Sequence, residues 1–441
     1  MTTVEQRLPG TAAQGRWITD WRPDDESFWE DTGAKVARRN LAFSIFSEHI
    51  GFSVWSLWSV LVLFLGPAYH VDPAGKFVLT TVPTALGAVL RLPYTFAVAK
   101  FGGRNWTMIS AALLLIPAVL AAVLVRPGVS YGTLLALAAV AGVGGGNFAS
   151  SMANINAFYP QRLKGWALGV NAGGGNLGVA VVQLVGLAVL ATAGSGHPRL
   201  VAGIYIPLIV LAALGAALWM DNLSGIRNDR RPMRDVTGDA HTWIVSVLYI
   251  GTFGSFIGFG FAFGQVLQVQ FAADFTTPAK AAYLTFLGPL VGSLVRPVGG
   301  WAADRIGGAR VTFWNFVAMA LGAAVVLVAS AQRSLALFIA GFVLLFVFSG
   351  IGNGSTYKMI PAIFRARTPA VEEARRLSGA AIGLAGAIGA FGGVLVNLAF
   401  RQSFLAYGSG TGAYIAFIAF YTVCSALTWV VYLRPRSLPG V

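Results

Sequence analysis

Two arginines, Arg91 and Arg296, lie inside long apolar segments of this 441-residue chain. A guanidinium group keeps its proton in a protein, so it cannot escape the cost of leaving water by becoming neutral. At the centre of a bilayer that cost is about 3 kcal/mol on insertion scales. Each arginine therefore needs an anionic partner or a wet cavity. Internal anions are scarce, because Glu48 is the only acidic residue well inside an apolar segment.

This excess of positive charge predicts a binding site for a small anion. The planar fork of an arginine can bind two oxygens of an oxyanion at once, and two opposed forks suit a flat, trigonal ion. The pattern alone leaves nitrate, nitrite, bicarbonate and formate as alternatives. A structural role is the competing interpretation, in which Arg91 and Arg296 pair with carbonyl groups or extend to the inner membrane surface. For Lys358, nearer the inner end of its segment, extension to that surface is favoured.

The composition indicates that the bilayer is the solvent of this chain. Hydrophobic residues make up 56% and charged residues 11%, and the mean hydropathy is +0.70, whereas soluble domains carry roughly 25% charged residues. Segments of about 20 apolar residues can cross a membrane as helices. Twelve such segments are predicted: 41–66, 77–99, 106–125, 132–158, 163–192, 200–220, 242–270, 280–301, 310–330, 334–363, 376–401 and 411–433.

The distribution of Lys and Arg predicts the orientation. If the N-terminus is cytoplasmic, most of the 31 basic residues fall in cytoplasmic segments and few in the outer loops. This bias predicts a multi-pass protein of the cell membrane with both termini in the cytoplasm. It also accounts for the net charge of +14 as a consequence of topology, so we expect no nucleic-acid partner.

The two halves of the chain carry the same pattern. The segment Gly87–Arg91 aligns with Gly292–Arg296, and the basic turn 100–103 (KFGG) aligns with 305–308 (RIGG). Such parallel repeats of six helices resemble the major facilitator superfamily. The predicted fold is an all-α polytopic membrane protein, with twelve transmembrane helices in two six-helix halves related by a pseudo-twofold axis. Its predicted parts are a cytoplasmic N-terminal segment (1–40), an N-terminal half (41–221), a cytoplasmic linker (222–241), a C-terminal half (242–433) and a cytoplasmic tail (434–441).

Other chemistry finds little support in the sequence. The single cysteine, Cys424, cannot form an internal disulfide, and no Cys or His spacing is typical of a metal site. The glycine-rich segments 142–178 and 379–393 suit close helix packing in a membrane. We therefore expect no metal, no cofactor and no catalytic residue, and the chain is not predicted to be an enzyme.

Several longer motifs resemble the nitrate/nitrite porter family of the major facilitator superfamily. They are GGGNFASSMANINAFYP (144–160), ALGVNAGGGNLGV (167–179), SGIGNGSTYKMIPAIF (349–364), RLPYTF (91–96) and GPLVGSLVRPVGGWAADRIGG (288–308), and the resemblance covers nearly the whole chain. It implies that nitrate binds near the midplane between two arginines and two aromatic rings. Carried over by motif, the arginines are Arg91 and Arg296, the rings Phe148 and Phe253, and the further hydrogen-bond donors Tyr249 and Asn176.

The resemblance implies transport of nitrate and nitrite by alternating access, with nitrate/nitrite exchange as the first expectation. Glu48, followed by His49, departs from what a pure exchanger needs, since a buried titratable group can bind a proton. Nitrate–proton symport using Glu48 is therefore the alternative, unless Glu48 and His49 form a structural pair near the inner surface. A membrane anion sensor is a distant alternative, which would require an appended output domain. We expect function as a monomer in the lipid bilayer.

Overall fold

The computed structural model describes residues 16–226, 231–275 and 277–434. Within these ranges, twelve helical segments are long and apolar enough to cross a membrane, and each overlaps one predicted segment. Several continue beyond their predicted ends, as expected for helices that extend past the bilayer. The predicted multi-pass, all-α fold is confirmed. The predicted tail, except its first residue, and residues 1–15 of the predicted N-terminal segment lie outside the described ranges.

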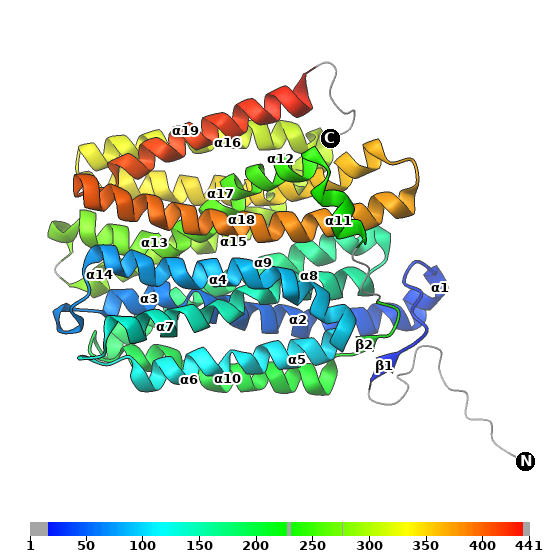
Figure 1. The fold of residues 1–441 in the computed structure, drawn as a ribbon, viewed down its shortest axis with the longest axis horizontal. Coiled ribbons are helices and arrows are strands. Elements are labelled where there is room, and N and C mark those ends of the chain that lie inside the picture. The colour runs from blue at the N-terminus through cyan, green and yellow to red at the C-terminus, as the bar shows by residue number, and fades with distance from the viewer. Residues whose placement is uncertain (1–15, 227–230, 276, 435–441) are drawn as a thin grey trace, which may run out of the picture.

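The first half of the chain forms one bundle, and Figure 1 shows it in blue to green. Its elements are β1 (Trp17–Ile18), α1 (Glu26–Phe28), η1 (Trp29–Gly33), α2 (Ala34–Trp55), α3 (Leu57–Phe64), η2 (Pro67–Tyr69), α4 (Pro73–Phe101), α5 (Gly103–Leu113), α6 (Leu115–Leu124), α7 (Tyr131–Ala141), η3 (Gly142–Gly146), α8 (Asn147–Phe158), α9 (Gln161–Thr192) and α10 (Pro198–Trp219).

The second half forms the other bundle, on the opposite side of the molecule in Figure 1. After the connecting elements β2 (Asn222–Leu223) and α11 (Arg231–Thr237), it contains α12 (Ala240–Tyr249), η4 (Ile250–Gly254), α13 (Ser255–Gln270), η5 (Ala272–Asp274), α14 (Pro278–Thr285), α15 (Leu287–Ile306), α16 (Gly308–Ala331), α17 (Leu335–Arg367), α18 (Val371–Tyr407), α19 (Thr411–Thr428) and η6 (Trp429–Leu433). The two bundles meet mainly where α4 packs against α18 and α9 against α15.

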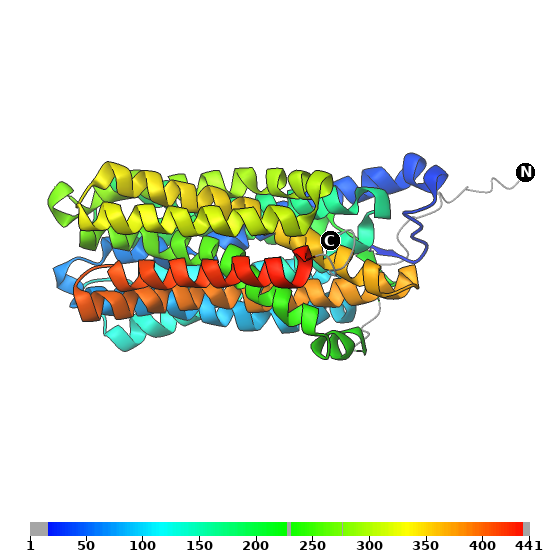
Figure 2. The ribbon, with the colours of Figure 1, turned by 90° about the horizontal axis from the view of Figure 1, so that it is seen from above.

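The helices of both bundles run along the same long axis, as the two views in Figures 1 and 2 show. The described N-terminal elements, helix α11 and the end of α19 all lie at one end of the molecule, which we call the terminal end. Many large apolar side chains point outward, including Leu211, Leu321 and Val423, each more than half exposed. Such a surface suits contact with lipid rather than water.

The sequence repeat corresponds to matched close contacts between helices. In the first half, a Cβ atom added at Gly145 would lie only 2.6 Å from the Cα atom of Gly87. In the second half, a Cβ atom at Gly350 would meet the carbonyl oxygen of Gly292. Gly87 and Gly292 each precede a buried arginine by four residues. The glycines thus let η3 approach α4, and α17 approach α15, at the level of the two arginines.

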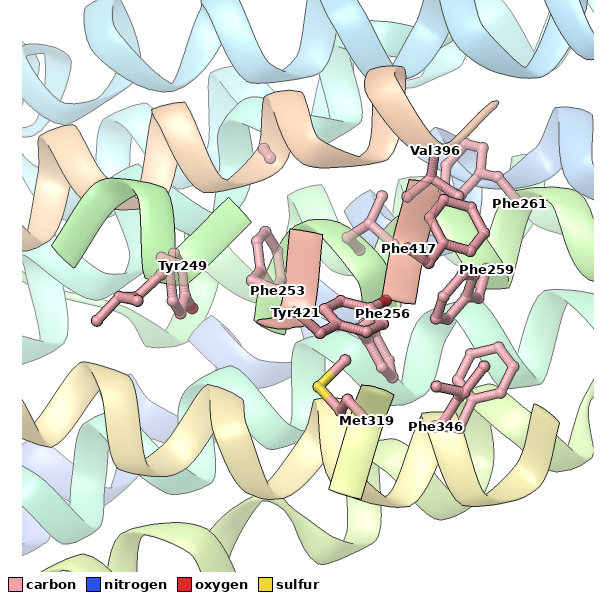
Figure 3. Close-up of a cluster of buried hydrophobic side chains, with 14 of the residues drawn as sticks. Tyr249, Phe253, Phe256, Phe259, Phe261, Met319, Phe346, Val396, Phe417 and Tyr421 are labelled. Atoms are coloured by element: carbon pink, nitrogen blue, oxygen red, sulfur yellow. The ribbon is translucent and has the colours of Figure 1, made fainter. Parts of the chain in front are cut away.

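Two departures from regular α-helix position aromatic side chains at the centre. The glycine-rich turn η3 is a 3-10 helix, and it leads directly into Phe148 in α8. The turn η4 is a π-helix that contains Phe253. Single turns of this kind often occur at functional sites. Figure 3 shows Tyr249 and Phe253 beside an aromatic cluster of the second bundle that includes Phe256 and Tyr421.

The described part of the N-terminal segment packs against the first bundle. Strand β1 pairs in parallel with β2, so it is tied to the chain that follows α10. Asp24 accepts a hydrogen bond of 2.8 Å from the backbone N–H of Gln161, and Glu26 forms an ion pair with Arg162. Residue 40, the predicted end of this segment, lies inside α2, which begins at Ala34. The segment therefore covers the terminal ends of α8 and α9.

We expect Gly145→Ala to lower the thermal stability of the protein, because its new methyl group would overlap the backbone of α4. Overpacking of this kind typically costs about 1–3 kcal/mol. The measurement is the melting temperature in detergent, monitored through tryptophan fluorescence. Gly169→Ala in α9 is the control, since a Cβ atom there meets nothing within 4 Å. Equal melting temperatures for Gly145→Ala and wild type would contradict a close contact here.

Candidate functional site

Arg91 is fully buried at the contact between the two bundles. It lies on α4, and its side chain has an exposed fraction of 0%. Its Nη1 donates a hydrogen bond of 2.7 Å to the carbonyl oxygen of Gly386 on α18, and its Nε donates one of 3.2 Å to the carbonyl of Gly145. The side chain therefore points to the interior and does not extend to a membrane surface.

Arg296 occupies the corresponding place on α15 and is also buried. Its Nη2 donates a hydrogen bond of 3.3 Å to the hydroxyl group of Tyr249. Its guanidinium carbon lies 5.7 Å from the ring centre of Tyr357 and 5.9 Å from that of Phe148. The two arginines thus share one aromatic neighbour, because Phe148 also faces Arg91.

Three aromatic rings form a stack beside the arginines. The rings of Phe148 and Phe253 come from different bundles and lie 5.9 Å apart at 26°. Tyr249 stacks on Phe253 at 5.2 Å and 10°, and the two residues are four positions apart in the chain. The guanidinium carbon of Arg91 is 4.6 Å from the centre of Phe148 and 4.7 Å from that of Phe253. Such cation–π contacts lower the cost of burying the charge.

Each guanidinium group keeps one buried nitrogen without a hydrogen-bond partner among the described residues. These atoms are Nη2 of Arg91 and Nη1 of Arg296. A buried donor with no acceptor is costly, and more so when it is charged. A small oxyanion would supply acceptors to both. The amide group of Asn176 on α9 is fully buried and likewise has no partner within the described ranges.

The structure thus brings Arg91, Arg296, Phe148, Phe253 and Tyr249 together by direct contact. Asn176 is buried too, but its amide makes no hydrogen bond to any of these five in the described structure. Its place as a ligand stays a prediction.

Glu48 lies next to this cluster. Its side chain on α2 is 1% exposed, and Oε2 accepts hydrogen bonds from Asn171 Nδ2 at 2.6 Å and from the hydroxyl group of Ser151. The carboxyl group interacts electrostatically with both Arg296 and Arg91. His49 points elsewhere, with Nδ1 3.1 Å from the carbonyl oxygen of Gly174. Glu48 therefore belongs to the buried centre, and the described structure does not pair it with His49.

Lys358 does not add a third positive charge to the centre. Its Nζ lies 2.8 and 2.9 Å from the two carboxyl oxygens of Asp304, and its side chain is 39% exposed. Asp304 is in the last turns of α15, two helical turns beyond Arg296. Lys358 is thus paired and partly exposed, and it does not belong to the buried centre.

Tyr357, Asn171 and Ser151 are residues of the site that the sequence analysis did not identify. All three lie within motifs quoted for the family resemblance, at 349–364, 167–179 and 144–160. Tyr357 contacts Tyr249 at 5.2 Å between ring centres as well as Arg296. Their position within these motifs was the sequence feature that could have identified them. Their contacts were not predictable, because each lies on a different helix from its partner.

The fold and the site define a transporter of the major facilitator type, and comparison with known proteins agrees. Residues 41–397 match the Major Facilitator Superfamily. A solved D-xylose-proton symporter has the same fold, with a TM-score of 0.68 and 15% identity over 92% of this chain and 98% of that one. Among curated proteins, the nitrate/nitrite transporter NarU of Escherichia coli is 38% identical over 95% of this chain and 96% of its own.

A second relative extends this similarity. The probable nitrate/nitrite antiporter NarK2 of Thermus thermophilus is 34% identical over 96% of this chain and 98% of its own length. The chain therefore belongs to the major facilitator superfamily and, within it, to the family of the nitrate/nitrite transporters.

Proposed function

We propose that this chain is a secondary transporter that carries nitrate and nitrite across the cell membrane by alternating access. The observation that carries the proposal is the pair of buried guanidinium groups at the contact of the two bundles, each with one donor lacking a partner in the described structure. The relatives named for nitrate and nitrite support this substrate. The site is expected to work within one monomer, since both arginines come from one chain.

A nitrate ion in this site would accept hydrogen bonds from Arg91 and Arg296 and lie against the rings of Phe148 and Phe253. Two aromatic contacts at van der Waals distance require a ring separation of about 7 Å. The rings are now 5.9 Å apart, so a planar ion between them would require a small outward movement. Because the rings belong to different bundles, this movement would couple binding to the relative position of the halves. Tyr249 and Asn176 are proposed as additional donors.

Hydrogen bonds between the bundles support alternating access. Away from the terminal end, Thr80 Oγ1 donates to Asn397 Oδ1 at 2.9 Å, and Gln183 Nε2 donates to the carbonyl oxygen of Gly260 at 2.8 Å. Phe77 stacks on Phe404 at 5.6 Å in the same region. With both termini in the cytoplasm, as proposed, these contacts close the outer side. Opening to the outside would break them.

Exchange is the proposed mode, because an occupied site is easier to close than an empty one. Bringing two guanidinium groups together in a low-dielectric interior is unfavourable unless an anion lies between them. An anion bound on either side removes that barrier, so nitrate moving one way can be exchanged for nitrite moving the other way. The relative named as an antiporter supports this mode.

A counterflow assay tests the substrate and the exchange. Purified protein in liposomes loaded with nitrite is expected to take up external labelled nitrate rapidly, because internal nitrite lets the carrier return occupied. Liposomes loaded with formate or bicarbonate serve as the comparison for specificity. If nitrite loading gave no faster nitrate uptake than protein-free liposomes, the proposed function would be wrong.

Arg296→Lys tests the role of the planar fork. Lysine keeps the positive charge but cannot bind two oxygens in a planar arrangement. A hydrogen bond to a charged group contributes about 1.5–3 kcal/mol, so we expect nitrate affinity in counterflow to fall roughly 10–100-fold. Arg305→Lys on the same helix is the matched control, since Arg305 lies over the ring of exposed Trp301. Wild-type affinity in Arg296→Lys would refute the fork argument.

A cysteine pair tests whether the outer contacts open during transport. Thr80→Cys and Asn397→Cys replace two buried side chains that are hydrogen-bonded across the bundles and would become accessible when the outer side opens. The native Cys424 is also buried, within the second bundle. Linking the pair with a short bifunctional thiol reagent is expected to stop counterflow, because the outer side can no longer open. Each single variant treated with the same reagent is the control. Full transport by the linked protein would show that these contacts need not separate.

A further inference from the structure

We propose that Glu48 is a proton-binding residue of the transport cycle, which allows one proton to enter with one nitrate when no internal anion is available for exchange. This inference rests on the proposed function and extends it to the coupling of the same site. It follows from three features of the structure: the burial of Glu48, the groups around its carboxyl, and the charge that they leave at the centre.

The carboxyl group of Glu48 occupies a place shaped for it. A Cβ atom added at Gly175 on α9 would lie 2.6 Å from its Cδ, so the helix surface is recessed where the carboxyl lies. Neutral donors from two helices, Ser151 on α8 and Asn171 on α9, hold Oε2. The second oxygen, Oε1, is buried and has no hydrogen-bond partner among the described residues. Oε1 is therefore the atom on which a proton would be carried.

The charged groups that act on Glu48 are the two arginines of the anion site. Arg296 on α15 and Arg91 on α4 are close enough for their charges to act on it, but neither forms a hydrogen bond or ion pair with its carboxyl group among the described residues. The ring of Tyr357 on α17, whose centre lies 5.7 Å from the guanidinium carbon of Arg296, belongs to the same set of buried groups. On α2 itself, the neighbouring His49 is directed toward Gly174. The carboxylate and the transported anion would therefore share the same two cations.

The net charge of the buried centre depends on which of these species it holds. Two guanidinium cations and one carboxylate leave one net positive charge in the empty site. Nitrate together with a proton on Glu48 leaves the same one net positive charge, because the added anion and the added proton cancel. The empty carrier and the carrier loaded with both species therefore carry the same net charge when the bundles close, although only the loaded carrier has an anion between the two guanidinium groups. Nitrate alone, or a proton alone, changes the buried charge.

The proton balance is simple. On the outer side, an O–H bond forms between Oε1 and a proton from water as nitrate binds the arginines. On the inner side, nitrate leaves, the exposed arginines favour the carboxylate, and the O–H bond breaks to return the proton to water. When internal nitrite is present, it replaces nitrate before the proton leaves, and the carrier returns occupied. The same site thus exchanges anions or imports nitrate with a proton.

Wild type, Glu48→Gln and Glu48→Asp in liposomes separate these two modes. One set of vesicles contains nitrite and is used to measure counterflow. The other set contains no nitrite or nitrate and is placed in a more acidic external buffer, with an internal pH dye and labelled nitrate outside. We expect wild type and Glu48→Asp to take up nitrate in the second set with about one proton per ion, as the charge balance requires. Glu30→Gln, an exposed carboxyl replacement on η1, is the matched control.

Glu48→Gln fixes the neutral form, so its empty site would hold two uncompensated cations. We expect the ratio of gradient-driven uptake to counterflow to fall about tenfold or more relative to wild type. The ratio corrects for any loss of folded protein, because both rates come from one preparation. The inference is overturned if wild type shows counterflow but no gradient-driven uptake, or if Glu48→Gln keeps the wild-type ratio. Absence of counterflow in wild type would instead overturn the proposed function, and this inference with it.

Discussion

The burial of two guanidinium groups at the contact between the bundles is the constraint on which the rest of the structure depends. Neither Arg91 nor Arg296 can become neutral, so every neighbour must offset a fixed positive charge. Aromatic faces, backbone carbonyls and the carboxyl group of Glu48 do this in part. One nitrogen of each arginine is still without an acceptor in the described structure. These two nitrogens are where the proposed anion would bind.

Local backbone irregularity is what makes this arrangement possible. Gly145 lies in a 3-10 turn that packs against Gly87, and its carbonyl accepts a hydrogen bond from Arg91. Regular helices with larger side chains would keep α4 and η3 too far apart for that contact. In the second bundle, the π-helical turn η4 places Phe253 beside Tyr249. Close helix packing and irregular helical turns therefore involve the same few residues.

The site also joins the bundles. Arg91 of the first bundle donates a hydrogen bond to the carbonyl oxygen of Gly386 in the second. Phe148 of the first bundle stacks on Phe253 of the second. Any relative movement of the bundles must change these contacts. In the proposed transport cycle, binding of an anion and movement of the halves are therefore linked by geometry, and Glu48 adds a titratable charge to that link. In that cycle, one set of side chains would respond to both anions and protons.

The sequence by itself determined the twelve membrane segments, the repeat and the two arginines, because these depend on segment length, composition and the charge of single residues. Through its motifs, the sequence also predicted that Phe148, Phe253 and Tyr249 lie close to the arginines. Only the tertiary structure decided that Glu48 is close enough to interact electrostatically with the arginines, that Asp304 pairs with Lys358, and that Tyr357 contacts Arg296. These contacts join helices distant in sequence, and the direction of each side chain follows from packing that no local pattern encodes.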